Sequence, residues 1–174
     1  MRYRFYADGV AVRACTLGRG LFALRAFEPD ELIVRLNGPK VDRNDPLHSF
    51  PEGANLLQTG RKSYILLEPP GVYANHSCDP NAGIRQNRYL TAIRSIVPDE
   101  EICFDYSTTM DEDYWIMPCA CGKPECREVV RDFKMLASDL QRRYLSMNVV
   151  QRFIARRYHR HLPTPANEPE RLFG

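Results

Sequence analysis

The first half of the chain alternates short apolar runs with turn-forming residues. Residues 9–16 and 31–36 are rich in β-branched side chains and are bounded by Gly, Pro or Asp. A further apolar run at 64–67 ends at a Pro-Pro-Gly turn, and residues 88–97 alternate roughly between apolar and polar positions. This pattern predicts a mainly β first half that is built of short strands.

After Cys126 the pattern becomes helical. Apolar residues recur three and four positions apart, at Phe133, Leu136, Ala137, Leu140 and Tyr144 and again at Val150, Phe153, Ile154 and Tyr158. We therefore expect two or three short helices between residues 128 and 161. A Pro-rich, frayed tail is expected from Pro163 onward.

Capping residues indicate where these helices begin. Ser138 with Gln141, and Asn148 with Gln151, have the spacing of N-caps with their capping-box partners. The basic run at 156–161 falls at the expected C-terminal end of the last helix, where cations suit the helix dipole. We interpret this run as a solvated helix end, with contact to an acidic partner as the alternative.

Two segments of the chain resemble each other. Residues 27–33 and 96–102 both place a Pro-Asp turn before an apolar strand-like run. Two copies without a fixed period do not make a repeat protein. We interpret the similarity as the same turn chemistry used at two hairpins.

Composition narrows the class of protein. The length of 174 residues fits one domain, and a hydrophobic fraction of 44% is enough for a core. The net charge of +2 is too small to argue for direct nucleic-acid binding. The N-terminus lacks the apolar run of a signal peptide, and no stretch has the length needed to span a bilayer. We expect a soluble, intracellular protein without a membrane partner.

The chain contains six cysteines. Three disulfides are one interpretation, but clustered cysteines in a reducing compartment are more often metal ligands. Cys119, Cys121 and Cys126 supply three thiolates within eight residues, and structural zinc needs four ligands. The spacing leaves the fourth ligand open among Cys15, His76, Cys78 and Cys103.

The segment 75–81 carries two amides besides an imidazole, a hydroxyl, a thiol and a carboxylate around one proline. A core strand gains nothing from so many polar groups, because each needs a partner once buried. His76 and Cys78 could form a base and nucleophile of a hydrolase, since residues two apart on an extended segment point the same way. No orienting group is evident, and a thiol bound to zinc cannot also attack.

Two further segments are weak signals when taken alone. The turn expected at Gly18-Arg19-Gly20 lets backbone approach a ligand, but it lacks the third glycine and the helix of a dinucleotide site. Residues 101–107 form a strand that ends on an aromatic residue, Tyr106, which packing alone could explain.

The order of these segments is more informative than any one of them. Residues 18–23, 75–81 and 101–106, followed by the Cys-x-Cys-x4-Cys cluster, resemble the SET-domain protein lysine methyltransferases that carry a post-SET zinc motif. The resemblance covers about residues 10–127. It implies a mainly β SET-domain fold of small sheets, in which the asparagine-histidine segment threads under a loop in a pseudoknot-like arrangement.

The resemblance also implies a division of the chain. Residues 1–110 would form the SET domain and residues 111–127 the zinc-bound post-SET loop. Residues 128–174 would form a helical C-terminal extension with a frayed tail.

Site residues follow from the same resemblance. S-adenosylmethionine, the methyl donor, would be held by Leu17, Gly18, Arg19, Gly20, Asn75, His76, Tyr106 and Ala120. One structural zinc ion would be held by Cys78, Cys119, Cys121 and Cys126.

The implied reaction is methyl transfer to the ε-amine of a lysine in a protein or peptide, histone or non-histone. Tyr106 would be the catalytic tyrosine, and Tyr64 would line the lysine channel with Trp115 as a further wall. Such a channel lowers the pKa of the lysine by desolvation. Phe104 stands where phenylalanine tends to permit di- or trimethylation. The alternatives are a non-catalytic SET-fold binding module with structural zinc and a purely structural zinc protein.

Overall fold

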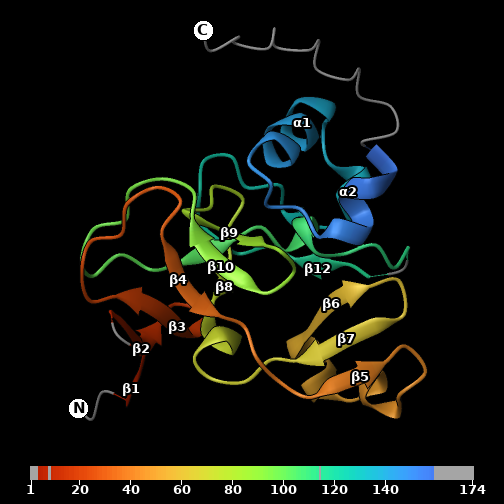
Figure 1. Cartoon of the computed structure of the whole chain (residues 1–174), viewed down its shortest axis with the longest axis horizontal. Helices are drawn as coiled ribbons and strands as arrows, with labels where there is room; N and C mark the ends of the chain where they lie inside the picture. Colours follow the sequence, from red (N-terminus) through yellow and green to blue (C-terminus); the bar gives the residue numbers. More distant parts are fainter. Residues whose placement is uncertain (1–3, 8, 114, 159–174) are drawn as a thin grey trace, which may run out of the picture.

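The computed structural model describes residues 4–7, 9–113 and 115–158, and it is built mainly of short strands. Figure 1 shows small sheets packed around the middle of the molecule, with both α-helices on one side of them. The predicted mainly β fold with C-terminal helices is confirmed. No helix in the described part of the chain is long and apolar enough to cross a membrane.

Three sheets have three strands each. The first has the order β1 (Arg4–Ala7), β2 (Val10–Cys15), β3 (Gly18–Ala23). The second has the order β4 (Leu32–Arg35), β10 (Tyr89–Ala92), β9 (Ala82–Arg85), and the third has the order β5 (Lys40–Asp42), β7 (Ser63–Leu66), β6 (Leu56–Gly60). All their pairings are antiparallel, so short connections suffice between most neighbours.

Two further sheets have only two strands each. They pair β8 (Asn75–His76) with β11 (Cys103–Phe104) in parallel, and β12 (Met117–Pro118) with β13 (Val129–Val130) in antiparallel fashion. Single 3-10 turns connect the strands, namely η1 (Pro46–Ser49), η2 (Pro51–Asn55), η3 (Gly71–Tyr73), η4 (Tyr106–Thr108) and η5 (Phe133–Met135).

Apolar side chains gather in two clusters. The larger one lies between the sheets and includes Leu21, Ile84, Leu90 and Ile102, all fully buried. The second cluster is formed mainly by C-terminal residues, with Phe133 and Tyr144 at its centre. The C-terminal helices therefore have a core of their own in addition to covering the sheets.

The turn expected at Gly18-Arg19-Gly20 is displaced in the structure. The hairpin turn lies at Thr16 and Leu17, and Gly18 already pairs with Cys15 as the first residue of β3. Gly18 has φ +104, a conformation that glycine adopts at little cost. The ladder between β2 and β3 thus includes Gly18 and Gly20, which the sequence predicted in the turn.

The C-terminal helices are confirmed in number, with α1 at Ser138–Ser146 and α2 at Arg152–Tyr158 besides the turn η5. Their predicted caps are wrong. Ala137 is the N-cap of α1, and the Gln141 amide instead donates to carbonyls of the preceding turn, including that of Phe133 at 3.1 Å.

Asn148 does not cap α2, because that helix begins four residues later. Asn148 has φ +56 in the loop before the helix. The first helical N–H, that of Arg152, is accepted at 3.0 Å by the side chain of Asn87, a residue distant in sequence. The basic run is described only as far as residue 158, and the tail from Pro163 lies outside the described residues.

The two similar segments contact each other. Phe27 and Ile96 exchange both backbone hydrogen bonds at 3.0 Å as an antiparallel bridge. Asp30 and Asp99 take matching positive φ values of 71° and 67° in the two turns. The shared turn chemistry is confirmed, and the two segments pair with each other through the Phe27–Ile96 bridge.

Candidate active site and metal centre

The parallel pair β8–β11 brings the polar segment beside Tyr106. Asn75 pairs with Cys103 and His76 with Phe104, and the chain then enters the 3-10 turn that begins at Tyr106. Cys103 lines one cavity while the adjacent Phe104 lines another. This alternation is expected because successive side chains on a strand point to opposite sides.

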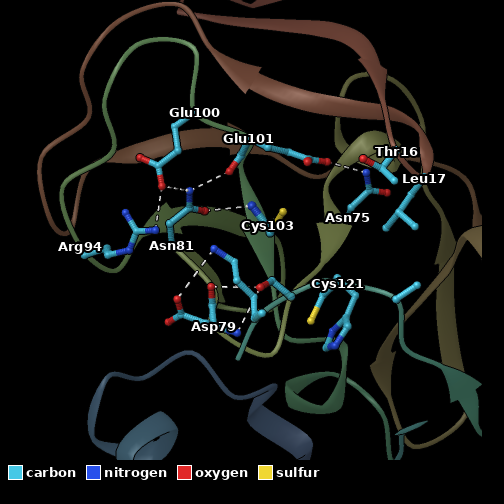
Figure 2. Close-up of a pocket in the computed structure, with 15 residues that line it drawn as sticks. Thr16, Leu17, Asn75, Asp79, Asn81, Arg94, Glu100, Glu101, Cys103 and Cys121 are labelled. Carbon is cyan, nitrogen blue, oxygen red and sulfur yellow. Dashed lines mark hydrogen bonds and ion pairs between the residues drawn. The ribbon is translucent and has the colours of Figure 1, made fainter. Parts of the chain in front are cut away.

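The first cavity has a volume of about 280 Å³ and is lined mostly by polar residues (Figure 2). Asn75 lies on the side of Thr16 and Leu17, where its amide donates to Glu101 Oε1 at 2.7 Å and to the carbonyl of Arg19 at 3.1 Å. Other lining residues are Thr16, Leu17, His76, Ser77, Asp79, Asn81, Arg94, Glu100, Cys103, Ala120, Cys121, Gly122 and Lys123.

Asn81 ties the opposite wall together. Its amide donates to Glu100 Oε1 at 2.9 Å and to the carbonyl of Glu101 at 2.8 Å, and its oxygen accepts the backbone N–H of Cys103 at 2.9 Å. Arg94 forms an ion pair with Glu100 at 2.7 Å. Among the described residues, Glu101 has no cationic partner of this kind, so its carboxylate can face a positively charged ligand.

The predicted cofactor residues fall into two groups. Leu17, Asn75, His76 and Ala120 line the first cavity. Gly18, Arg19, Gly20 and Tyr106 do not line it.

Arg19 and Gly20 of β3 do not line the cavity themselves but contact residues that do. The Arg19 guanidinium stacks over the ring of Tyr73 at 4.5 Å, while its carbonyl holds Asn75. A Cβ atom on Gly20 would come within 2.3 Å of Glu101 Oε1. The glycine therefore makes room for the Glu101 carboxylate.

The second cavity has a volume of about 480 Å³ and aromatic walls. Tyr64, Phe104, Tyr106 and Trp115 all line it, which brings together the residues predicted for the lysine channel. The rings of Phe104 and Tyr106 lie 4.8 Å apart. His48 from η1 also lines the cavity and meets the ring of Tyr64 edge-on at 4.6 Å.

The Tyr106 hydroxyl is held in one orientation. It donates to the carbonyl of Ala74 at 3.0 Å, so its oxygen retains lone pairs that can accept from a ligand. Burial raises the pKa of Tyr106 well above its ordinary value, and the nearby Cys103 and Glu101 raise it further. Tyr106 is therefore a neutral phenol near pH 7 and cannot act as a strong base.

Four cysteines converge beside the first cavity. The Sγ atoms of Cys78, Cys119, Cys121 and Cys126 all lie within 4.8 Å of one another. Thiolates at 2.3 Å from a tetrahedral zinc are about 3.8 Å apart, and the Sγ atoms of Cys78 and Cys119 are 3.7 Å apart. The donor set and its spacing fit a structural zinc ion, with Cys78 as the fourth ligand.

His76 connects this cluster to the active-site turn. The backbone N–H of Tyr106 donates to His76 Nδ1 at 3.2 Å, so the ring proton must reside on Nε2, which lies 3.4 Å from Cys78 Sγ. Burial lowers the pKa of His76 to about 4, although the charge of Asp105 opposes the shift. A neutral imidazole therefore donates to Cys78 Sγ, as histidines and other groups beside metal ligands commonly do.

This tautomer argues against the hydrolase alternative. Cys78, His76 and Asp105 do lie in the order of a catalytic triad, with Asp105 Oδ1 at 3.6 Å from His76 Nδ1. However, Nδ1 accepts a hydrogen bond from the backbone N–H of Tyr106 and Nε2, which faces Cys78, already carries the ring proton, so the ring cannot take the proton of the thiol. Cys78 is also one of the four clustered thiols.

Asp105 is the centre of a buried network that the sequence did not reveal. Arg127 binds its two carboxylate oxygens at 2.7 Å each, and the Tyr144 hydroxyl of α1 donates to it at 3.0 Å. The backbone N–H of Arg127 donates to Cys78 Sγ at 3.4 Å. The network thus links helix α1, the cysteine loop and the turn that begins at Tyr106.

Several other site residues were missed at the sequence level. Asp79 and Asn81 belong to the polar segment that was singled out, and Glu100 and Glu101 immediately precede the strand of Phe104. The only signal in the sequence for these four residues was that they lie next to the motifs. For Arg94, Lys123 and Tyr144 no local signal existed, because only the tertiary fold places them here.

Comparison with known proteins agrees with this arrangement. The sequence profile of the SET domain matches residues 18–107. The chain belongs to the SET-domain family. In this SET protein Cys119, Cys121 and Cys126 follow the matched region, as a post-SET zinc motif does, and Cys78 lies within it.

Relatives of this SET protein carry histone methyltransferase names. The yeast Saccharomyces cerevisiae protein "Histone-lysine N-methyltransferase, H3 lysine-4 specific" is 27% identical over 128 residues, covering 62% of this chain and 12% of that protein. Human "Histone-lysine N-methyltransferase 2B" is 24% identical over 131 residues, covering 66% of this chain and 5% of that protein. The chain thus spans only a small part of these relatives.

Among solved structures, a candidate histone methyltransferase from Plasmodium falciparum matches with a TM-score of 0.47 and 22% identity. The match covers 58% of this chain and 95% of the other.

Proposed function

We propose that this SET protein transfers a methyl group from S-adenosylmethionine to the ε-amine of a protein lysine. The observation that carries the proposal is the pair of cavities on the two sides of β11, one lined by Cys103 and the other by Phe104. One is polar and contains Asn75 and Glu101, and the other is aromatic and contains Tyr64 and Tyr106. A methyl donor and an amine placed in them would meet at this strand.

The polar cavity fits the methyl donor. S-adenosylmethionine supplies an electrophilic methyl group on a positively charged sulfur when it is bound. The Glu101 carboxylate complements its positive charge, and Asn75 and His76 offer hydrogen-bonding groups beside it. The volume of about 280 Å³ is near the lower end of the range for small-molecule sites, as suits a cavity that the cysteine loop partly covers.

The aromatic cavity fits the lysine. An amine with an ordinary pKa near 10.4 is about 0.1% neutral at pH 7.4. Aromatic walls lower that pKa by desolvation and thereby raise the neutral, nucleophilic fraction. The fixed hydroxyl of Tyr106 can then accept a contact from the amine or the methyl group, so catalysis rests on orientation.

We propose a structural role for zinc at the four cysteines. The ion would hold Cys119 and Cys121 against Cys78, and Ala120 and Cys121 form part of the polar cavity. The free energy of metal binding would thus stabilise the folded conformation of this wall.

We further propose di- or trimethylation, because Phe104 leaves a hydrophobic wall where a tyrosine would place a hydroxyl beside the amine. The relatives make the histone H3 tail the first substrate to test, with other basic proteins as the alternative.

The test is incubation of the protein with labelled S-adenosylmethionine, core histones and a panel of lysine peptides. Label on lysine, identified by mass spectrometry and lost in Tyr106→Phe, is the expected result. Binding of S-adenosylmethionine without any transfer would favour a non-catalytic SET-fold module. Absence of both binding and transfer would favour a structural zinc protein.

A further inference from the structure

Glu112 is a buried carboxylate that the proposed reaction has not yet used. It is 5% exposed and lines the aromatic cavity together with Tyr106 and Trp115. Within residues 4–7, 9–113 and 115–158, no hydrogen bond or ion pair reaches its carboxylate, and its oxygens open into the cavity instead of being fully enclosed. The adjacent Asp111, in contrast, forms an ion pair with Arg157 at 2.5 Å.

A carboxylate that opens into a cavity without a cationic partner is a favourable contact for a positively charged ligand, because hydrogen bonds between charged groups are the strong ones. The cavity around Glu112 is open enough for one, with a volume of about 480 Å³. A cation that enters this cavity would restore the interactions that the carboxylate lost on burial.

Hydrogen bonds hold the backbone on both sides of Glu112. The N–H of Asp111 donates to the Gln58 side chain at 3.0 Å, and that of Asp113 donates to the buried Asp132 at 2.6 Å. The carbonyl of Met110 also accepts the N–H of Phe133 at 3.1 Å. The carboxylate is therefore presented from a fixed loop.

The other walls indicate what kind of cation fits. Tyr64, Phe104 and Trp115 offer aromatic surface for an alkyl chain and for a cation above a ring. A hydrated metal ion gains little from such walls, whereas an alkylammonium gains from both the rings and the carboxylate.

We propose that Glu112 determines the charge selectivity of this cavity, so that the cavity binds a primary alkylammonium in preference to a neutral molecule of the same shape. Glu112 captures the lysine in its charged form, and the amine is desolvated as it moves toward Tyr106. The inference rests on the proposed function only in taking lysine as the natural ligand.

The experiment uses n-butylammonium chloride, which reproduces the lysine side chain, and 1-butanol as its neutral counterpart. Trp115 is the only tryptophan of the chain and lines the cavity, so its fluorescence reports occupancy. Saturation-transfer NMR on the same samples detects binding directly. Sodium chloride at equal ionic strength controls for salt.

The wild-type protein is expected to bind n-butylammonium about tenfold or more tightly than 1-butanol, the range of a charged hydrogen bond. Glu112→Gln removes the charge at nearly constant shape and is expected to abolish this preference, whereas Glu112→Asp should retain most of it. Glu28→Gln, at an exposed glutamate, is the matched control and should bind as the wild type does.

Equal binding of the two probes by the wild type, or an unchanged preference in folded Glu112→Gln, would overturn the inference. The probes require no methyl transfer, so the two proposals can fail separately. Charge-selective binding in a protein that methylates nothing would leave this inference standing and refute the proposed function.

Discussion

The two cavities beside β8 and β11 are built in different ways. The aromatic cavity takes its tyrosine, phenylalanine and tryptophan walls from β7, β11, η4 and the loop after it. The polar cavity is assembled from the β2–β3 turn, the segment 75–81, the residues around Glu101 and the cysteine loop 120–123. One cavity therefore depends on local strand packing, and the other depends on segments that the four cysteines hold together.

This difference predicts that the two sites respond differently to damage. Loss of the cysteine cluster should open the polar cavity and spare the aromatic one. Changes at Tyr64, Phe104 or Glu112 should alter the aromatic cavity and spare the polar one. His76 lies between the two responses, because it lines the polar cavity and also accepts the backbone N–H of Tyr106, which lines the aromatic one.

The largest effect is expected from Cys78→Ser. Methyl transfer should fall below detection and affinity for S-adenosylmethionine about tenfold or more, because the 120–123 wall loses its anchor. Binding of n-butylammonium should change by less than about threefold. Zinc content by atomic absorption should fall from one ion per chain to none, while Cys15→Ser, outside the cluster, should retain the ion. Full activity in zinc-free protein would contradict the coupling.

Tyr106→Phe should lower turnover about a hundredfold, since a small loss of orientation in a displacement reaction has effects of that size. The ring still packs against Phe104, so the affinity for S-adenosylmethionine should stay within about threefold. Single-turnover kinetics and calorimetry separate the two quantities. Unchanged turnover would exclude the role proposed for this hydroxyl.

Tyr144→Phe tests the link between α1 and the active-site turn. It deletes the hydroxyl that donates to Asp105 at 3.0 Å, and a buried hydrogen bond to a charged group contributes about 2 kcal/mol. Chemical denaturation should show this loss of stability, with turnover reduced as well if Asp105 positions Tyr106. Tyr158→Phe, on the same apolar cluster, should cost about 0.5 kcal/mol or less. Equal losses in both variants would remove the special role of Asp105.

Glu101→Gln keeps an acceptor for Asn75 but removes the charge that faces the polar cavity. Affinity for S-adenosylmethionine should fall about fivefold to tenfold, whereas affinity for S-adenosylhomocysteine, which lacks the sulfonium charge, should fall less. A calorimetric titration of each compound measures the difference. Parallel losses for both compounds would show that shape alone matters at this residue.

The smallest effect on rate is expected from Phe104→Tyr. An added hydroxyl in the aromatic cavity should restrict the product to fewer methyl groups while the first transfer stays within about threefold. Mass spectrometry of the modified peptide gives the distribution. An unchanged distribution, or a wild type that forms only monomethyl-lysine, would refute the role of Phe104.

The sequence predicted the tyrosine, phenylalanine and tryptophan walls of the aromatic cavity, and half of the predicted cofactor residues line the polar one. Tyr64, Phe104 and Tyr106 lie in or next to short strands, so motif and structure coincide. Glycines 18 and 20 were placed in a turn, but the ladder of β2 and β3 includes them and leaves Thr16 and Leu17 at the cavity. The predicted helix caps failed for a similar reason, because Asn87 from a distant loop supplies the contact at α2.

Charge partners were the least predictable part of the site. Asp105 adjoins Tyr106, the proposed catalytic tyrosine, in sequence, yet its partners Arg127 and Tyr144 come from the cysteine loop and from α1. Glu112 was one acidic residue among several in the segment 111–113 until the fold placed it in the cavity. Pairing of this kind depends on tertiary distances, which spacing along the chain does not contain.

Simultaneous occupancy is the most direct test of two adjacent cavities that hold donor and amine. S-adenosylhomocysteine would be titrated into the protein in the calorimeter, with and without saturating n-butylammonium. Two separate cavities predict an affinity for S-adenosylhomocysteine that changes by less than about threefold and a stoichiometry of one in both titrations. Mutual exclusion of the two ligands would contradict the account.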